Sequence, residues 1–252
     1  MQKLLFSAFL LLGCATTAGL RAADLPPSLY FEKVEPKALT TLSIHFDEGG
    51  KVYGNLHWIP TEMDGAHGQL DGTIKGDIVR VTYNYTIEGS EQSEEQVYKI
   101  EGNKLIRGEG ESREVSSGKV VFVRNTTFTF PGDNVLTRVV VQEPKPGAPE
   151  RKAIMNALRG PVSKHIGKPV QFVGSLRIKG DWARLSGGAQ TMDGKPPANE
   201  NAADELELDL TAFLRKDAEG VWQPVHWGFA GDISVIEDAR EKCEGASWVL
   251  FD

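Results

Sequence analysis

The sequence predicts a mainly β protein with a smaller α+β part, and three patterns carry this prediction. Short segments in which apolar and polar residues alternate, separated by glycine-rich turns, fill the chain from about residue 29 to 125. The run Glu143 to Pro149 then has three prolines in seven residues, which is typical of a linker. A helical stripe and two further strand pairs follow it. We therefore expect two domains, residues 29–125 and 149–252, joined by a connecting segment over residues 126–148.

The first domain is predicted as an antiparallel meander. Its clearest strand is residues 79–87, where Val79, Val81 and Tyr83 alternate with polar residues. The other expected strands cover residues 41–46, 52–58, 69–75, 96–100, 104–109 and 119–123. Because an open meander of this length would leave two exposed edges, we expect it to close into a small barrel. Glycines inside several strands permit the strong bending that a small barrel requires.

Several motifs in this half resemble a lipocalin-like domain of bacterial lipoproteins of unknown function. They are Gly50-Lys51-Val52-Tyr53-Gly54, Trp58-Ile59-Pro60, the run from Gly68 to Asp77, and the run from Tyr83 to Gly89. The resemblance covers about residues 42–123. It implies a barrel and a surface anchor, but no chemistry and no cofactor.

The second domain is predicted as a helix on a four-stranded antiparallel sheet. Ile154, Leu158, Val162 and Ile166 recur every four residues and indicate an amphipathic helix over residues 150–166, which Pro161 could divide in two. The expected strands cover residues 170–178, 182–189, 205–215 and 221–230. The loop from residue 191 to 203 is polar and rich in turn residues, and its role stays open.

With the runs Arg151 to Ile154, Gly180 to Ala183 and Gly220 to Trp222, this half resembles a small secreted domain of cystatin-like or NTF2-like character from proteobacteria. Those folds serve as inhibitors, ligand-binding modules and a few enzymes, so the resemblance chooses no function. The run Gln171 to Gly174 is similar to the protease-binding loop of cystatins. It falls within an expected strand, however, and an ordinary strand is the better interpretation.

The first 23 residues have the layout of an export signal. Lys3 precedes an apolar run from Leu4 to Leu12, and Gly13-Cys14 follows it. The run Leu11 to Cys14 resembles the lipobox of bacterial lipoproteins, which implies lipidation of Cys14 and a membrane anchor. Ordinary cleavage near Ala18 or Ala22 is the alternative. We expect the periplasmic face of the outer membrane in the first case, and a soluble periplasmic or secreted protein in the second.

Composition and motifs exclude several function classes. A formal net charge of −7 makes nucleic acid an unsuitable partner. The sequence contains no nucleophile elbow and no phosphate-binding glycine loop, so we expect no catalytic residues. His57 and His67 are the histidines that neighbouring strands could bring together, but chance explains them equally well, and we expect no metal or other cofactor. Flanking carboxylates predict an inert thiol at Cys243.

The aromatic residues are the remaining candidates for a binding site. The set is Tyr53, Trp58, Tyr83 and Tyr85 in the barrel, with Trp182, Trp222 and Trp227 in the second domain. Core packing is the favoured interpretation for the three tryptophans and the alternative for the barrel aromatics, where a filled barrel is slightly favoured over a hollow one. The sequence thus predicts a non-enzymatic envelope lipoprotein that binds a small apolar molecule or a lipid. The alternative is an envelope scaffold that contacts other proteins.

Overall fold

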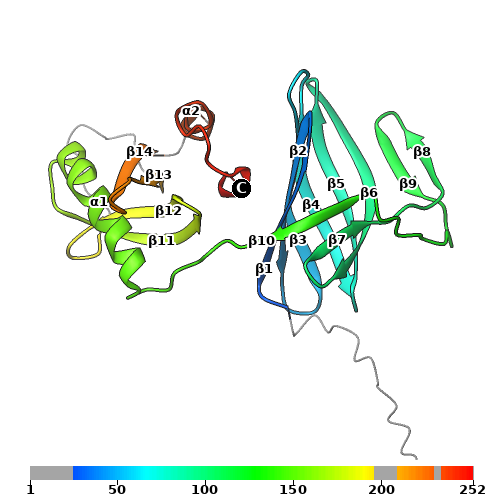
Figure 1. The fold of residues 1–252 in the computed structure, drawn as a ribbon, viewed down its shortest axis with the longest axis horizontal. Coiled ribbons are helices and arrows are strands. Elements are labelled where there is room, and N and C mark those ends of the chain that lie inside the picture. Colours follow the sequence, from blue (N-terminus) through cyan, green and yellow to red (C-terminus); the bar gives the residue numbers. More distant parts are fainter. Residues whose placement is uncertain (1–24, 196–208, 230–233, 252) are drawn as a thin grey trace, which may run out of the picture.

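The computed structural model describes residues 25–195, 209–229 and 234–251, and it contains two antiparallel sheet systems (Figure 1). Cys14 and residues 196–203 of the polar loop lie outside the described residues. The strands of the first system are β1 (Ser28–Glu35), β2 (Ala38–Phe46), β3 (Lys51–Pro60), β4 (Ala66–Lys75), β5 (Ile78–Ile87), β6 (Ser90–Glu101), β7 (Lys104–Arg107), β8 (Ser112–Ser116), β9 (Lys119–Phe122) and β10 (Val135–Val139).

Eight of these strands close into a barrel, as predicted. They follow the order β5-β4-β3-β2-β1-β10-β7-β6, and β6 pairs again with β5 along its length. The strand β10 lies inside the range 126–148 that the sequence predicts as a connecting segment. It pairs with β1 and β7, so the barrel wall is complete only with residues beyond 125. The strand has only five residues, so its alternation of apolar and polar residues gives a weak signal in the sequence.

Alternation along the strands places apolar side chains inside the barrel. Val79, Val81 and Tyr83 on β5 are buried, while Arg80 between them is exposed. Glycines allow the wall to bend where strands cross closely. A Cβ added at Gly54 would overlap the Ser43 carbonyl oxygen of the neighbouring strand, and Gly68 and Gly72 are similarly confined.

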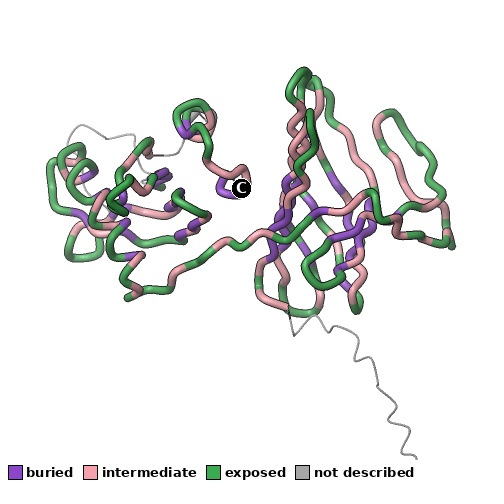
Figure 2. Tube along the Cα trace, in the orientation of Figure 1, coloured by how far each residue is buried: buried purple, intermediate pink, exposed green. Residues whose placement is uncertain are grey.

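The strands β8 and β9 form an arm outside the barrel. They pair with each other, and β9 joins β6 through a short parallel contact at Ser93 and Lys119. Every residue of β8 is exposed. Figure 2 shows the arm without buried residues, in contrast to the barrel interior.

The second sheet has the order β11-β12-β13-β14, formed by β11 (Val170–Lys179), β12 (Trp182–Thr191), β13 (Asp209–Lys216) and β14 (Trp222–Phe229). The helix α1 (Pro149–Ile166) packs on one face, as predicted. It runs without interruption through Pro161, which is exposed. Gly167 ends it in the left-handed conformation, with φ of 77°. The buried residues of the helix are Arg151, Ile154, Leu158 and Val162.

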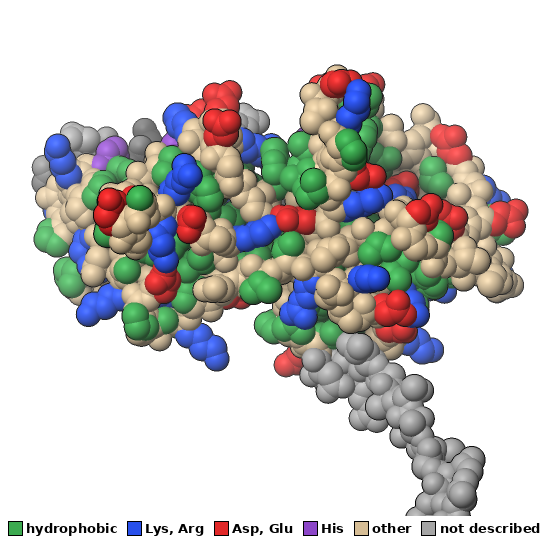
Figure 3. Space-filling model, in the orientation of Figure 1, with side chains coloured by type: hydrophobic (Ala, Val, Ile, Leu, Met, Phe, Trp, Pro, Cys, Tyr) green, Lys and Arg blue, Asp and Glu red, His purple; other side chains and the backbone are tan. Residues whose placement is uncertain are grey.

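The opposite face of this sheet is covered by the C-terminal segment. The helix α2 (Ser234–Lys242) and the 3-10 helix η2 (Trp248–Leu250) form a separate core cluster with Trp182 and Phe213. The segment from Ser247 also meets the barrel, since Lys179 and Ser247 both bind the Glu32 carboxylate of β1. No helix among the described residues is long and apolar enough to cross a membrane. Positive and negative side chains are interspersed over the face seen in Figure 3.

Candidate functional site

The candidate site is a cavity of about 330 Å³ at one end of the barrel. All eight strands of the barrel contribute residues to its wall, and β5 and β6 contribute the most. The residues used below line it together with Leu56 and Leu136: Trp58, Ala66, Tyr83, Tyr85, Glu94, Gln96, Tyr98 and Arg107, with Lys33 and Glu35 at the rim. Two hollows of about 480 and 490 Å³ lie outside, between the arm and the barrel wall. We favour the inner cavity because buried side chains shape it.

The barrel is filled at one end and hollow at the other. Leu29, Phe31 and Ile100 are fully or almost fully buried in the packed part. At the hollow end β4 contributes only the small side chain of Ala66, and β7 already stops at Arg107. A filled barrel, which the sequence slightly favours, is therefore wrong for this end. The small side chain of Ala66 and the end of β7 thus both lie at this cavity.

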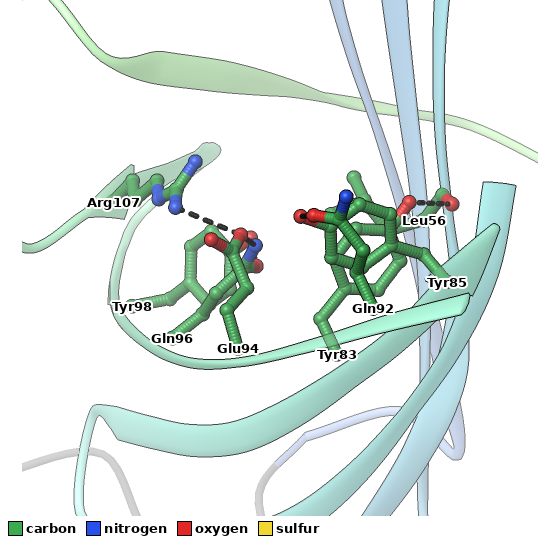
Figure 4. A network of polar contacts seen from close by, with 8 residues as sticks. All are labelled: Leu56, Tyr83, Tyr85, Gln92, Glu94, Gln96, Tyr98 and Arg107. Atoms are coloured by element: carbon green, nitrogen blue, oxygen red, sulfur yellow. Dashed lines mark hydrogen bonds and ion pairs between the residues drawn. The ribbon is translucent and has the colours of Figure 1, made fainter. Parts of the chain in front are cut away.

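One wall of the cavity is aromatic. The rings of Tyr83 and Tyr85 stack with their centroids 4.4 Å apart and their planes 10° from parallel. The Tyr83 hydroxyl donates a hydrogen bond to the Leu56 carbonyl oxygen at 3.0 Å, and the Tyr85 hydroxyl donates to Gln92 Oε1 at 2.9 Å (Figure 4). Both hydroxyls are thus already engaged. The stacked rings are held as a fixed, flat surface.

The other wall carries a row of hydrogen-bonded polar side chains, which we call the polar chain. The Tyr98 hydroxyl donates to Gln96 Oε1, and Gln96 Nε2 donates to Glu94 Oε1. Arg107 Nη2 donates to the same Glu94 oxygen at 3.1 Å (Figure 4). Tyr98 and Gln96 are each 2% exposed, whereas the Arg107 side chain is 38% exposed. The chain therefore leads from the barrel core to an accessible guanidinium.

Burial also fixes the protonation of the tyrosines. Desolvation raises the pKa of Tyr98 well above its ordinary value, and the nearby Arg107 opposes this only in part. Desolvation likewise raises the pKa of Tyr83, with the neighbouring Tyr98 adding to it. Both phenols stay neutral and act as hydrogen-bond donors at neutral pH. The cavity thus offers a flat apolar surface and one ion pair, while its phenol hydroxyls donate to protein groups.

Three of the four barrel aromatics predicted from the sequence meet at this cavity: Trp58, Tyr83 and Tyr85. Tyr53 does not. It is 54% exposed and lies against His45 on the outer surface, with ring centroids 5.2 Å apart. The reason is the strand period, because Tyr53 follows the inward-facing Val52 and so faces outward.

The sequence reasoning missed the polar wall. Glu94, Gln96 and Tyr98 alternate along β6 and share the inner face, and Arg107 joins them from β7. The period of two was a signal that could have found them. Glu94 and Gln96 are residue types usually found at the surface, however, and this hid their inward orientation.

The tryptophans of the second domain are packing residues. Trp222 is 3% exposed in the core beneath α1, and its indole N–H donates to Glu150 Oε1 at 2.8 Å. Trp182 packs with Phe213 on the opposite face of the sheet. Trp227 is partly buried beside the ring of His165. They lie in the second domain, away from the barrel cavity.

The histidines and the cysteine lie elsewhere. His57 and His67 are directly opposite each other on β3 and β4. Burial, together with His57 and Arg240, lowers the pKa of His67. Within the described ranges, no group of three or more His, Cys, Asp or Glu residues is placed to hold a metal ion. Cys243 is buried, and its burial raises the pKa of the thiol to about 11, which disfavours the reactive thiolate.

Comparison of the chain with family models, with curated proteins and with solved structures found no match.

Proposed function

We propose that the barrel binds a small amphipathic molecule in its cavity. The single observation that carries the proposal is the hollow end of the barrel, where the Tyr83–Tyr85 stack faces the ion pair of Glu94 and Arg107. A flat apolar body would lie along the stacked rings. A polar group that accepts hydrogen bonds would reach Arg107, since a guanidinium has five N–H donors and one is used here by Glu94.

The size of the cavity limits the ligand. A volume of about 330 Å³ is at the lower end of the range for small-molecule sites. A whole diacyl lipid is too large for it, so the proposal narrows the ligand to a single ring system or a short chain. The polar wall further favours a molecule with one polar end over a pure hydrocarbon.

A fluorescence titration with 1-anilinonaphthalene-8-sulfonate tests this proposal, because the probe joins flat rings to an anionic acceptor. Tyr85→Leu should weaken its binding by removing half of the stack, and Ala66→Leu should do so by filling the cavity. Tyr53→Leu is the matched control, since it makes the same change on the outer surface. Equal affinity in all four proteins would overturn the proposal.

We also propose that the protein is exported and anchored through Cys14. The support is the signal-like layout of residues 1–23, with the lipobox-like run Leu11 to Cys14. More than one acyl chain at Cys14 would hold the protein stably on a membrane. Labelling with an alkyne fatty acid in a bacterial host should mark the wild type and leave Cys14→Ser unlabelled. Labelling of both proteins would refute the assignment.

A further inference from the structure

The strand β8 is an edge strand at the end of the barrel sheet. In the strand order β9 lies between β8 and the barrel strand β6, and no strand among the described residues pairs with the other side of β8. All five residues of β8 are exposed. Figure 1 shows the arm on the side of the barrel that faces away from the second domain. An edge of this kind is a template for pairing with a further strand.

The backbone hydrogen bonds of the arm show which groups of β8 face outward. Val123 donates its N–H to the Glu111 carbonyl oxygen at 2.8 Å, so the backbone groups of Glu111 face the β9 side. Because backbone groups alternate sides along a strand, those of Gly110, Ser112 and Glu114 point away from β9. In the part of the chain that the structure describes, no hydrogen bond reaches these outward groups.

The arm is attached to the barrel at several points, so the edge is held in place. Its strand β9 pairs with β6 where Lys119 lies opposite Ser93. The N–H of Phe122 donates to the Glu95 carboxylate at 2.8 Å, which adds a second attachment to β6. The ring of Phe122 also packs edge-on against Phe128, with centroids 4.7 Å apart. A fixed edge loses little conformational freedom when another strand binds to it.

Charged side chains flank the middle of the edge. Glu111 and Arg113 lie on either side of Ser112 and share one face of the strand. Both are exposed, and neither forms an ion pair with another described residue. The order acidic, neutral, basic is complementary to itself when a second copy runs in the opposite direction.

This charge order selects one register for two antiparallel copies. Registers that bring outward backbone groups together are centred on Glu111, Ser112, Arg113 or Glu114. Centring on any of the three charged residues places that residue opposite its own copy, and like charges directly opposite are destabilising. Centring on Ser112 instead places Glu111 of each copy opposite Arg113 of the other. Only this register gives two ion pairs and no like-charge pair.

We propose that β8 pairs with β8 of a second copy of this chain, antiparallel and centred on Ser112. The two Ser112 residues exchange two backbone hydrogen bonds, and each Gly110 exchanges two with Glu114 of the other copy. The two arms then form one sheet of four strands between two barrels. Neither the barrel cavity nor the membrane anchor takes part in this contact. The interface is small, so the dimer forms at high protein concentration.

Sedimentation velocity of the intact protein over a wide concentration range tests the proposal. The wild type should shift from monomer to dimer as its concentration rises. Arg113→Glu and Glu111→Arg should each weaken the dimer at least about tenfold, because each change puts like charges opposite each other. Arg124→Glu is the matched control, since it makes the same charge change at an exposed position outside the edge. It should leave the dimer unchanged.

Mixing the two charge variants supplies the decisive comparison. In a pair of Glu111→Arg with Arg113→Glu both cross-strand contacts again join opposite charges, so the equal mixture should associate about as well as the wild type. Restored association also shows that both variants are folded. Ser112→Pro should abolish the dimer and keep the arm, because the lost N–H faces outward.

Three results would overturn the proposal. The first is a wild type that stays monomeric at every concentration. The second is a dimer of Arg113→Glu or Ser112→Pro that is as stable as that of the wild type. The third is an equal mixture of the two charge variants that associates no better than each variant alone.

Discussion

Replacing Tyr98 by phenylalanine tests whether the polar chain of the cavity wall supports the barrel. The Tyr98 hydroxyl donates to Gln96 Oε1, and both side chains are buried. The substitution keeps the ring but leaves a buried amide oxygen without its donor. We expect a loss of about 1–3 kcal/mol in the free energy of unfolding at pH 7. Tyr85→Phe removes a hydroxyl whose partner, Gln92, is only half-buried, so it should cost less.

The same substitution should change the response to alkaline pH. In the folded protein the pKa of Tyr98 is raised above its ordinary value of 10.0. The stability that the neutral phenol contributes is therefore present below pH 10 and is lost as the pH rises above that value. Each pH unit above 10 costs the wild type about 1.4 kcal/mol from this one group, until the folded pKa is reached. Phenylalanine cannot ionise. The stability difference between the two proteins should therefore shrink above pH 10.

Urea unfolding at pH 8 and pH 11, followed by far-UV circular dichroism and by tryptophan fluorescence, measures both effects. Two domains need not unfold together, so the comparison is made on the transition that Tyr98→Phe shifts. An equal stability of the two proteins at pH 8 would refute the hydrogen-bond argument. A stability difference that stays constant between pH 8 and pH 11 would refute the argument from the pKa of Tyr98.

Three further predictions concern packing and one surface ion pair. Gly54→Ala drives a methyl group into the Ser43 carbonyl, so the free energy of unfolding should fall by about 1–3 kcal/mol; an unchanged midpoint of thermal unfolding would contradict this. Leu158→Ala should lower the free energy of unfolding measured in urea by about 2–5 kcal/mol, and a loss below about 1 kcal/mol would argue against a packed α1 interface. Lys216 and Trp222 lower the pKa of Glu150, so the stability that ionised Glu150 contributes is lost as the pH falls below 4.5. Glu150→Gln should therefore lose less stability than the wild type in this acid range, and an equal loss in both proteins would contradict the assignment.

The sequence predicts the architecture because the alternation typical of strands and the spacing typical of a helix face are both clear in it. Val79 to Tyr83 alternate over a full strand, and Ile154, Leu158 and Val162 mark one helix face. The sequence assigns the residues of β10 to the connecting segment and not to the barrel, because the strand has only five residues and its pairing with β1 depends on distant contacts. The helix α2 was not predicted, since it is short and mostly polar.

The candidate site could be predicted only in part. Side chains alternate between the two faces of a strand, and this alternation brings Tyr83 and Tyr85 to the inner face of the barrel. The same alternation places Tyr53 on the outer face. The meeting of Glu94 with Arg107 depends on the register between β6 and β7, where neither residue type signals burial. The hollow itself depends on where β7 ends. Such features follow from tertiary pairing and have no local signature.

Native mass spectrometry of the protein purified from a bacterial host without added ligand tests the central proposal most directly. We expect a reproducible extra mass of a small molecule that is released on denaturation. We also expect that Ala66→Leu, which fills the cavity, loses this mass, whereas Tyr53→Leu keeps it. A bare polypeptide mass for the wild type, together with unchanged probe binding in Ala66→Leu, would contradict a binding role for the barrel.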